Sequence, residues 1–169
     1  EYLGRAIQDL TGRTGAGQSN ITPRNRSHAE LQFNLPTLFP DTYLPDVHAR
    51  LVFYKRIAGA RSAEELHELQ LEAIDRFGPP PEAAKSLFRI SKLRLDSQAI
   101  GLRRFTLDQH GGKMEFDPHS SIDPGPLLRL IANEPSVFRM AGSHSVQILK
   151  PLEEQPTRLE FAERLLAQL

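Results

Sequence analysis

Residues 99–116 read AIGLRRFTLDQHGGKMEF and mark the point at which the character of the sequence changes. Before them, apolar residues recur every three to four positions, as they do along one face of a helix. Within them, Leu102–Leu107 and Lys113–Phe116 are strand-like runs, and the Gly111-Gly112 pair between them predicts a turn. The sequence therefore predicts a helical half followed by a sheet that begins with a β-hairpin.

Three helices are expected upstream of this point. Asp46 is a candidate N-cap for the first helix. Ser62 and Glu65 form a Ser-x-x-Glu capping box, in which the serine hydroxyl bonds the amide of Glu65 and the glutamate carboxylate reaches back, so a second helix is predicted over residues 62–77. Consecutive prolines cannot continue a helix but can begin one, which predicts a third helix over residues 81–98.

The remaining elements decide the fold class. An early strand is expected at Leu31–Leu35, a short helix after Asp123, a second hairpin around residues 141–143 and a final amphipathic helix over Thr157–Leu169. Helices and strands are segregated rather than alternating. We therefore expect an α+β fold, in which a helix-rich N-terminal half packs on a small antiparallel sheet built from two hairpins plus the early strand, with a closing C-terminal helix.

The chain is long enough for one domain with its own core, because it has 169 residues. Residues 1–10 carry a weak helical pattern and are followed by a run rich in Gly, Thr, Ser and Asn, which cannot bury enough apolar surface to order itself. We expect an N-terminal helix and flexible linker over residues 1–29 and the folded domain over residues 30–169.

Composition limits the class of protein. Lys and Arg number 21, as do Asp and Glu, so the chain lacks the net positive charge of an autonomous nucleic-acid binder. The absence of cysteine excludes disulfides, thiolate nucleophiles and cysteine metal sites, and fits a reducing compartment. No run approaches the length of a membrane span, and the N-terminus does not resemble a signal peptide. We expect a cytoplasmic protein that does not bind a membrane.

The residue patterns offer little catalytic chemistry. None of the six histidines forms a metal-binding i, i+4 pair, and the glycine spacing does not match a phosphate-binding loop. Asp117 and His119 precede two serines and superficially resemble parts of a catalytic triad, but Asp-Pro-His-Ser fits a turn. We therefore expect no catalytic residue, metal or cofactor, with a small hydrolase that uses Asp117 and His119 as a remote alternative.

The predicted second helix carries an acidic face. At about 100° per residue, its outward carboxylates fall within an arc of roughly 80°, opposite its apolar side; they are Glu64, Glu68, Glu72 and Asp75. No lysine stands at i+4 to compensate them, and Leu71 projects beside them. An apolar residue framed by carboxylates is typical of an interface with a basic partner. The alternative is a solvated face with one stray leucine.

A local excess of basic residues follows on the predicted third helix and beyond it. Its candidates for a nucleic-acid contact are Lys85, Arg89, Lys92 and Arg103. No aromatic residues are interleaved with them, as they are in many proteins that bind single strands. The pattern favours a charge balance with the acidic helix and leaves the nucleic-acid contact as the alternative.

Three long segments resemble a known family. Residues 35–47 (LPTLFPDTYLPDV), 50–58 (RLVFYKRIA) and 74–81 (IDRFGPPP) are similar to the C-terminal domain of bacterial transcription-repair coupling factors, the Mfd family. The similarity extends from about residue 30 to residue 169, through Gly112-Lys113 and the closing residues 157–160 (TRLE). The chain is thereby identified as a member of this family.

The resemblance implies a part in a larger machine. Proteins of this family are ATP-driven DNA translocases that dislodge stalled RNA polymerase and recruit UvrA. The chain contains none of the motor motifs, so ATP and Mg belong to the parent motor, and we expect no ATP hydrolysis here. The resemblance further implies that the domain packs on a UvrB-homology module of the same protein, contacts its arginines through Glu72 and Asp75, and masks the UvrA-binding surface.

Overall fold

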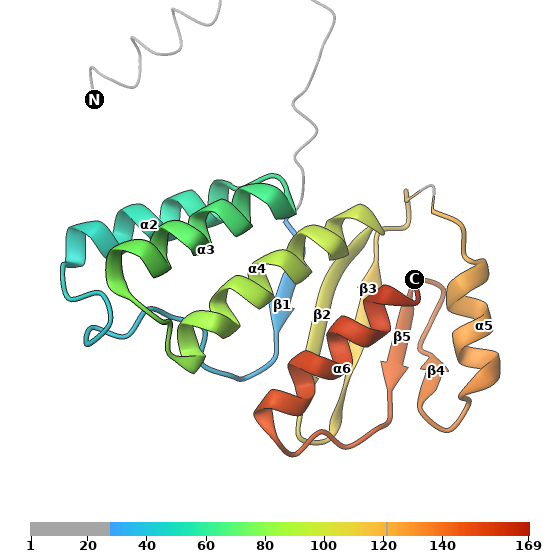
Figure 1. Ribbon diagram of the computed structural model, residues 1–169. Coiled ribbons are helices and arrows are strands. Elements are labelled where there is room, and N and C mark those ends of the chain that lie inside the picture. Colours follow the sequence, from blue (N-terminus) through green and yellow to red (C-terminus); the bar gives the residue numbers. More distant parts are fainter. Residues whose placement is uncertain (1–27, 121) are drawn as a thin grey trace, which may run out of the picture.

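The computed structural model describes residues 28–120 and 122–169 (Figure 1). Residues 1–27, which contain the expected N-terminal helix and most of the expected linker, lie outside the described residues. The first described element is the short strand β1 (Glu30–Gln32), which ends before the expected Leu35 because Asn34 adopts a positive φ of 52°. Ala29, one residue before β1, is already buried.

Three helices follow β1, as predicted: α2 (Val47–Gly59), α3 (Ala63–Phe77) and α4 (Glu82–Ala99). The carboxylate of Asp46 accepts from the amide of His48 at 3.1 Å and caps α2. The hydroxyl of Ser62 accepts from the Glu65 amide at 3.2 Å and caps α3. The Glu65 carboxylate reaches back one residue further than the capping box predicts, because it accepts from the amide of Arg61 at 2.8 Å.

The sheet has five strands, and its order is β1-β2-β3-β5-β4. The later strands are β2 (Leu102–Asp108), β3 (Gly111–Phe116), β4 (Phe138–Met140) and β5 (Ser145–Ile148). The α+β class and both hairpins are confirmed. The early strand differs from the others, because β1 pairs with β2 in parallel and makes the sheet mixed. The cause is the long crossover through α2, α3 and α4, which returns the chain to the end of the sheet at which β1 began.

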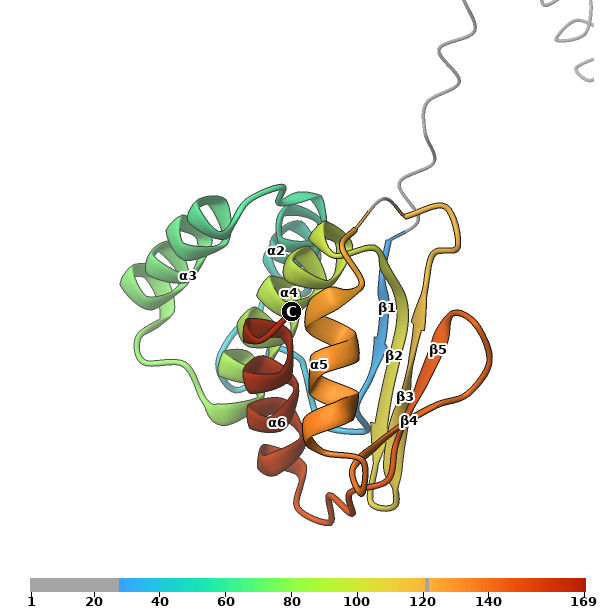
Figure 2. The same ribbon diagram turned by 90° about the vertical axis from the view of Figure 1, so that its right-hand side faces the viewer.

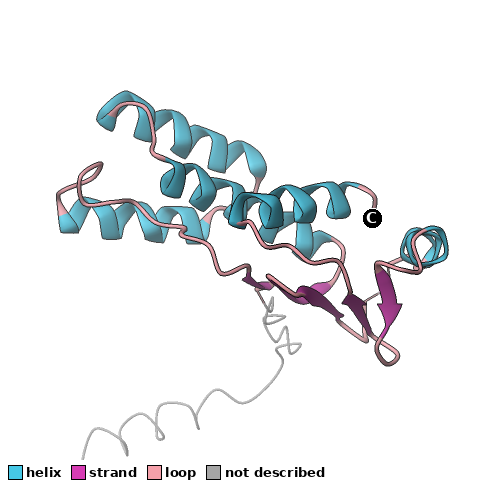
Figure 3. Cartoon of the chain, turned by 90° about the horizontal axis from the view of Figure 1, so that it is seen from below, coloured by secondary structure: helices cyan, strands magenta, loops and turns pink. Residues whose placement is uncertain are grey.

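α4 and the two later helices lie on one face of the sheet, and α2 and α3 continue beyond the β1 edge on the same side (Figures 2 and 3). The last two are α5 (Gly125–Asn133) and α6 (Gln155–Ala167), and α6 packs beside α4. One hydrophobic cluster lies between the sheet, α4 and α6; its fully buried members include Leu102, Phe105, Leu107, Met114, Val146, Ile148 and Leu159. A second cluster joins α2, α3 and the start of α4; its members include Phe39, Leu44, Phe53, Ile57, Leu66, Ala73 and Phe88.

The Gly111-Gly112 pair does not form the predicted turn. Asp108 pairs with Gly111, so the turn consists of Gln109 and His110, and the glycines begin β3. Gly111 has φ +136°, and a Cβ atom there would overlap the carbonyl oxygen of Ile148 on β5. The glycine is therefore required by the close approach of β3 to β5 rather than by a turn.

Arg158 of α6 is buried and holds together segments from the two ends of the domain. Its Nε donates to the carbonyl of Leu152 at 2.9 Å, and its Nη1 donates to the carbonyls of Phe33 and Asn34 at 3.1 Å. Its Nη2 donates to the carbonyl of Glu153 at 3.2 Å. The guanidinium thus satisfies backbone acceptors of the loop after β1 and of the loop before α6.

Candidate functional site

The acidic face of α3 has the orientation expected from helical periodicity. Leu66, Leu69 and Ala73 are buried on the inner side of the helix. The outermost side chains, which we call the α3 ridge, are Glu64, Glu68, Leu71 and Asp75, and all four are exposed. Leu71 keeps 51% of its surface accessible. In the part of the chain that the structure describes, none of the three ridge carboxylates has an ion-pair partner.

Glu72 lies apart from the ridge and turns towards α2. Its carboxylate forms ion pairs with Arg56 of α2 at 2.7 Å and with Arg76, one turn further along α3, at 3.4 Å. The hydrogen bond from Arg56 lowers the pKa of the Glu72 carboxyl below its ordinary value, and Arg76 adds to the effect. Both guanidiniums also lie over the ring of Phe53, at 5.4 Å from its centroid. The Glu72 charge is therefore balanced within the domain.

This pairing makes a modest, pH-dependent contribution to stability. Because the folded-state pKa of Glu72 is lowered, the contribution is present above the ordinary carboxyl pKa and is lost as the pH falls through the lowered value. Glu72→Gln is expected to cost up to about 1 kcal/mol at neutral pH, since the pair is largely solvent-exposed. Urea unfolding at neutral and acidic pH checks this, and a cost that persists at acidic pH would contradict it.

Three of the four basic residues of α4 are paired within the domain, and the fourth, Arg94, has no ion pair among the described residues. Lys85 contacts Glu82 at 3.2 Å, Lys92 contacts Asp96 at 3.1 Å, and Arg89 contacts Glu163 of α6. Arg103, at the start of β2, is exposed and has no ion pair among the described residues. Three of the four candidates for a nucleic-acid contact thus have their charge balanced locally, and the fourth lies on another element. These three ion pairs lie within α4 or between α4 and α6, and none of them joins α4 to the acidic helix α3, with which the sequence pattern favours a balance.

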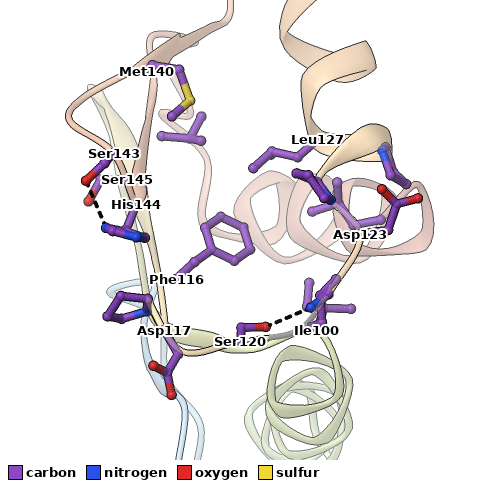
Figure 4. A pocket seen from close by; sticks show the side chains of 16 residues that line it. Ile100, Phe116, Asp117, Ser120, Asp123, Leu127, Met140, Ser143, His144 and Ser145 are labelled. Carbon is purple, nitrogen blue, oxygen red and sulfur yellow. Dashed lines mark hydrogen bonds between the residues drawn. The ribbon is translucent and has the colours of Figure 1, made fainter.

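A cavity of about 300 Å³ opens beside the loop that holds Asp117 and His119 (Figure 4). Its interior is apolar, with Phe116 pointing inward, and its polar lining includes Asp117 and Asp123. The carboxylate of Asp117 accepts from the backbone amide of His119 at 2.9 Å, which is the turn interaction that the sequence indicates. His119 does not line this cavity, so the two residues do not form an acid–base pair there.

The cavity rim also holds a serine–histidine contact that the sequence analysis did not single out. The hydroxyl of Ser143 lies 2.9 Å from Nδ1 of His144, and the two residues are neighbours in the β4–β5 turn. Among the described residues, no carboxylate is hydrogen-bonded to His144, so nothing orients the imidazole as a general base. The contact is local turn structure.

The described ranges hold neither a cluster of metal ligands nor a helix that could span a membrane. No group of three or more His, Asp or Glu side chains in residues 28–120 and 122–169 is placed to hold a metal ion. No helix in the same part of the chain combines the length and apolar character that crossing a membrane requires.

Comparison with known proteins identifies the family. The model of the TRCF domain family matches residues 33–127. Transcription-repair-coupling factor of Haemophilus influenzae is 41% identical over 98% of the chain, and that of Escherichia coli is 36% identical over 100% of it. The chain belongs to the transcription-repair-coupling factor family. It spans 14% of the length of each of these two curated relatives.

A solved structure shares the fold of this transcription-repair-coupling factor domain. The crystal structure of a C-terminal domain of transcription-repair coupling factor superposes with a TM-score of 0.67 and 21% sequence identity. The match covers 84% of this chain and 94% of that chain. The α+β arrangement of helices and mixed sheet is therefore that of the family's C-terminal domain.

Two arginines of the site were missed at the level of sequence. Arg76 stands four residues after Glu72, so its contact follows from helical spacing, but only lysine was considered at that position. The contact of Arg56 depends on how α2 packs against α3, and no local pattern reveals it. Ile74, which is 39% exposed, lies on the flank of α3 and extends its apolar surface beyond Leu71.

Proposed function

We propose that this domain is a non-catalytic regulatory domain of a transcription-repair-coupling factor. In this proposal it packs on the UvrB-homology module of the same protein and masks the surface that binds UvrA. The parent protein is a cytoplasmic DNA translocase that removes stalled RNA polymerase, and it holds the ATP and Mg in its motor. The observation that carries the proposal is the α3 ridge, an exposed leucine framed by carboxylates without partners in the described part of the chain.

The ridge suits a contact that must open. Each exposed ion pair is worth about 0–1 kcal/mol, and several of them around one apolar residue give a coupling small enough to be released by another event. Charge reversal on the ridge replaces attraction by repulsion, so its effect on binding exceeds that of removing the charge. The partner surface is expected to be basic, as the arginines implied by the family resemblance are.

Asp75 carries more of this proposal than Glu72. The carboxylate of Glu72 already accepts from Arg56 and Arg76, so its net charge towards a partner is small. Substituting Glu72 by lysine would also place three cations together at the α2–α3 contact and disturb the domain itself. Asp75 has no such partner among the described residues, so its reversal reports the external contact alone.

The test is calorimetric titration of the domain into the separately expressed UvrB-homology module at low and high salt. Asp75→Lys is expected to weaken binding roughly tenfold at low salt, with a smaller effect at high salt. Glu160→Lys makes the same charge change at an exposed position of α6 and should leave binding unchanged. Equal affinity of wild type and Asp75→Lys, or absence of wild-type binding, would count against the proposed contact.

A further inference from the structure

The hairpin of α2 and α3 concentrates exposed apolar surface. Of the ten large apolar side chains that stand exposed in the described residues, five lie on these two helices: Val47, Leu51, Val52, Leu71 and Ile74. The two helices run antiparallel at the end of the molecule away from β4 and β5 (Figures 1 and 3). An apolar concentration of this kind on one supersecondary unit marks an interaction surface.

The two helices of this hairpin carry opposite charges on their outer surfaces. The sequence of α2 contains His48, Arg50, Lys55 and Arg56 but no Asp or Glu. The outward side of α3 carries the carboxylates of the α3 ridge. Where the two helices meet, the Arg56–Glu72–Arg76 contacts balance one another. The outer surface is therefore cationic along α2 and anionic along α3.

Unpaired charges remain on both sides of this division. Lys55 on α2 and Arg61 just after it are exposed, and so are Glu68 and Asp75 on α3. None of these four forms an ion pair within the described part of the chain. By helical position at about 100° per residue, Val52 and Lys55 face the same way on α2 as Leu71 and Asp75 do on α3. We call these six residues, Val52, Lys55, Arg61, Glu68, Leu71 and Asp75, the hairpin face.

The spacing of these charges makes the hairpin face self-complementary. We propose that it binds a second copy of this chain, in a two-fold dimer whose axis runs along the hairpin between the two facing copies. A rotation about that axis keeps each residue at its level along the helices and exchanges the α2 side for the α3 side. Lys55 then faces Asp75 of the second copy, and Arg61 faces Glu68 of the second copy.

The ion pair between Arg56 and Glu72 shows which residues of α2 and α3 stand at a similar height along the two antiparallel helices. From it, the heights of the other charged residues can be compared. Lys55 lies one residue before Arg56, and Asp75 lies three residues after Glu72 on the antiparallel helix, so their levels differ by about 3 Å. Arg61 lies beyond the end of α2, one residue before Ser62, the N-cap of α3, so helical rise does not set its level, and it stands on the link side of Glu68. Lys55 and Asp75 therefore come into register, Arg61 reaches Glu68 of the second copy from the link between the helices, and Val52 and Leu71 are covered in the same contact.

This dimer goes beyond the proposed regulatory contact and can fail independently of it. Binding to the UvrB-homology module uses the α3 ridge only, whereas self-association needs α2 as well. The two contacts compete for Glu68 and Asp75, so the domain can dimerise only where its ridge is free. Lys55→Glu/Arg61→Glu is therefore expected to abolish the dimer and to leave the regulatory contact in place.

Sedimentation velocity of the whole chain over a range of protein concentrations tests the proposal. Wild type is expected to pass from a 19.0 kDa species to twice that mass as concentration rises. Lys55→Glu/Arg61→Glu makes all four charged positions of the hairpin face acidic, and Glu68→Lys/Asp75→Lys makes all four basic. Each double variant alone should dimerise at least tenfold more weakly than wild type, because like charges then face each other.

An equimolar mixture of the two double variants should recover the dimer, since each acidic hairpin face now meets a basic one. This recovery also shows that both variants are folded. The matched control Glu134→Lys/Glu160→Lys changes the charge equally at exposed positions outside the hairpin face and should dimerise as wild type does. A wild type that stays at 19.0 kDa, double variants that dimerise normally, or a mixture that stays monomeric would each overturn the proposal.

Discussion

Arg158→Met is expected to lower the free energy of unfolding of the domain by about 2–4 kcal/mol. The substitution keeps much of the apolar stem but removes all four hydrogen bonds from the guanidinium to backbone carbonyls. The carbonyls of the buried residues Phe33 and Leu152 then carry the cost of desolvation without a donor, whereas Asn34 and Glu153 are exposed and their carbonyls can bond water. Because two of those acceptors belong to Phe33 and Asn34, the loop after β1 also loses its attachment to α6.

Urea unfolding of Arg158→Met beside Arg164→Met measures this effect. Arg164 lies on the same helix but is exposed, and its side chain makes no hydrogen bond within the described residues. Its substitution is expected to change stability by no more than about 0.5 kcal/mol. Similar losses for the two variants would show that Arg158 contributes only as a surface residue.

Gly111→Ala is the second substitution for which we expect a large effect. The new Cβ would overlap the carbonyl oxygen of Ile148, and alanine disfavours the φ of +136° that Gly111 adopts. The pairing of β3 with β5, in which Gly112 stands opposite Ile148, would have to shift. We expect a loss of about 2 kcal/mol or more, which corresponds to a melting temperature lowered by roughly 4–8 °C.

The chain offers a matched control in Gly59→Ala. Gly59 is the last residue of α2, its φ is not positive, and no heavy atom would lie within 4 Å of an added Cβ. Alanine there should be neutral or add up to about 1 kcal/mol through helix propensity. Thermal unfolding followed by circular dichroism compares the two variants, and equal melting temperatures would refute the argument from close approach.

The helix ends and the buried face of α3 could be predicted from the sequence, because each depends on residues only a few positions apart. The hydroxyl of Ser62 and the carboxylate of Asp46 cap their helices as the sequence indicates, and Gly78, with φ +87°, ends α3. Periodicity alone also separated the buried Leu66 and Leu69 from the exposed Leu71. These features depend on residues a few positions apart, which is the range that a sequence pattern samples.

The features that were missed depend on contacts between distant segments. The parallel pairing of β1 joins Leu31 to Phe105, and the contact of Arg56 with Glu72 joins two helices. The Gly111-Gly112 pair predicts a turn, but glycine also occurs where two backbones approach closely. Only the position of β5 shows that close approach is the reason here. Three cations of α4 pair with Glu82, Asp96 and Glu163 rather than with the acidic helix α3, and the contact of Arg89 with Glu163 joins residues that are 74 positions apart.

The two hydrophobic clusters imply an order of events during synthesis of the chain. The cluster of α2, α3 and α4 is complete once Phe88 has been added, because its members lie between residues 39 and 88. The cluster beneath the sheet extends from Phe33 to Leu166 and cannot close before α6 exists. Contacts close in sequence form faster than distant ones. The helical half is therefore expected to collapse while the chain is still being synthesised, and β1 waits for α6 before its own cluster can close.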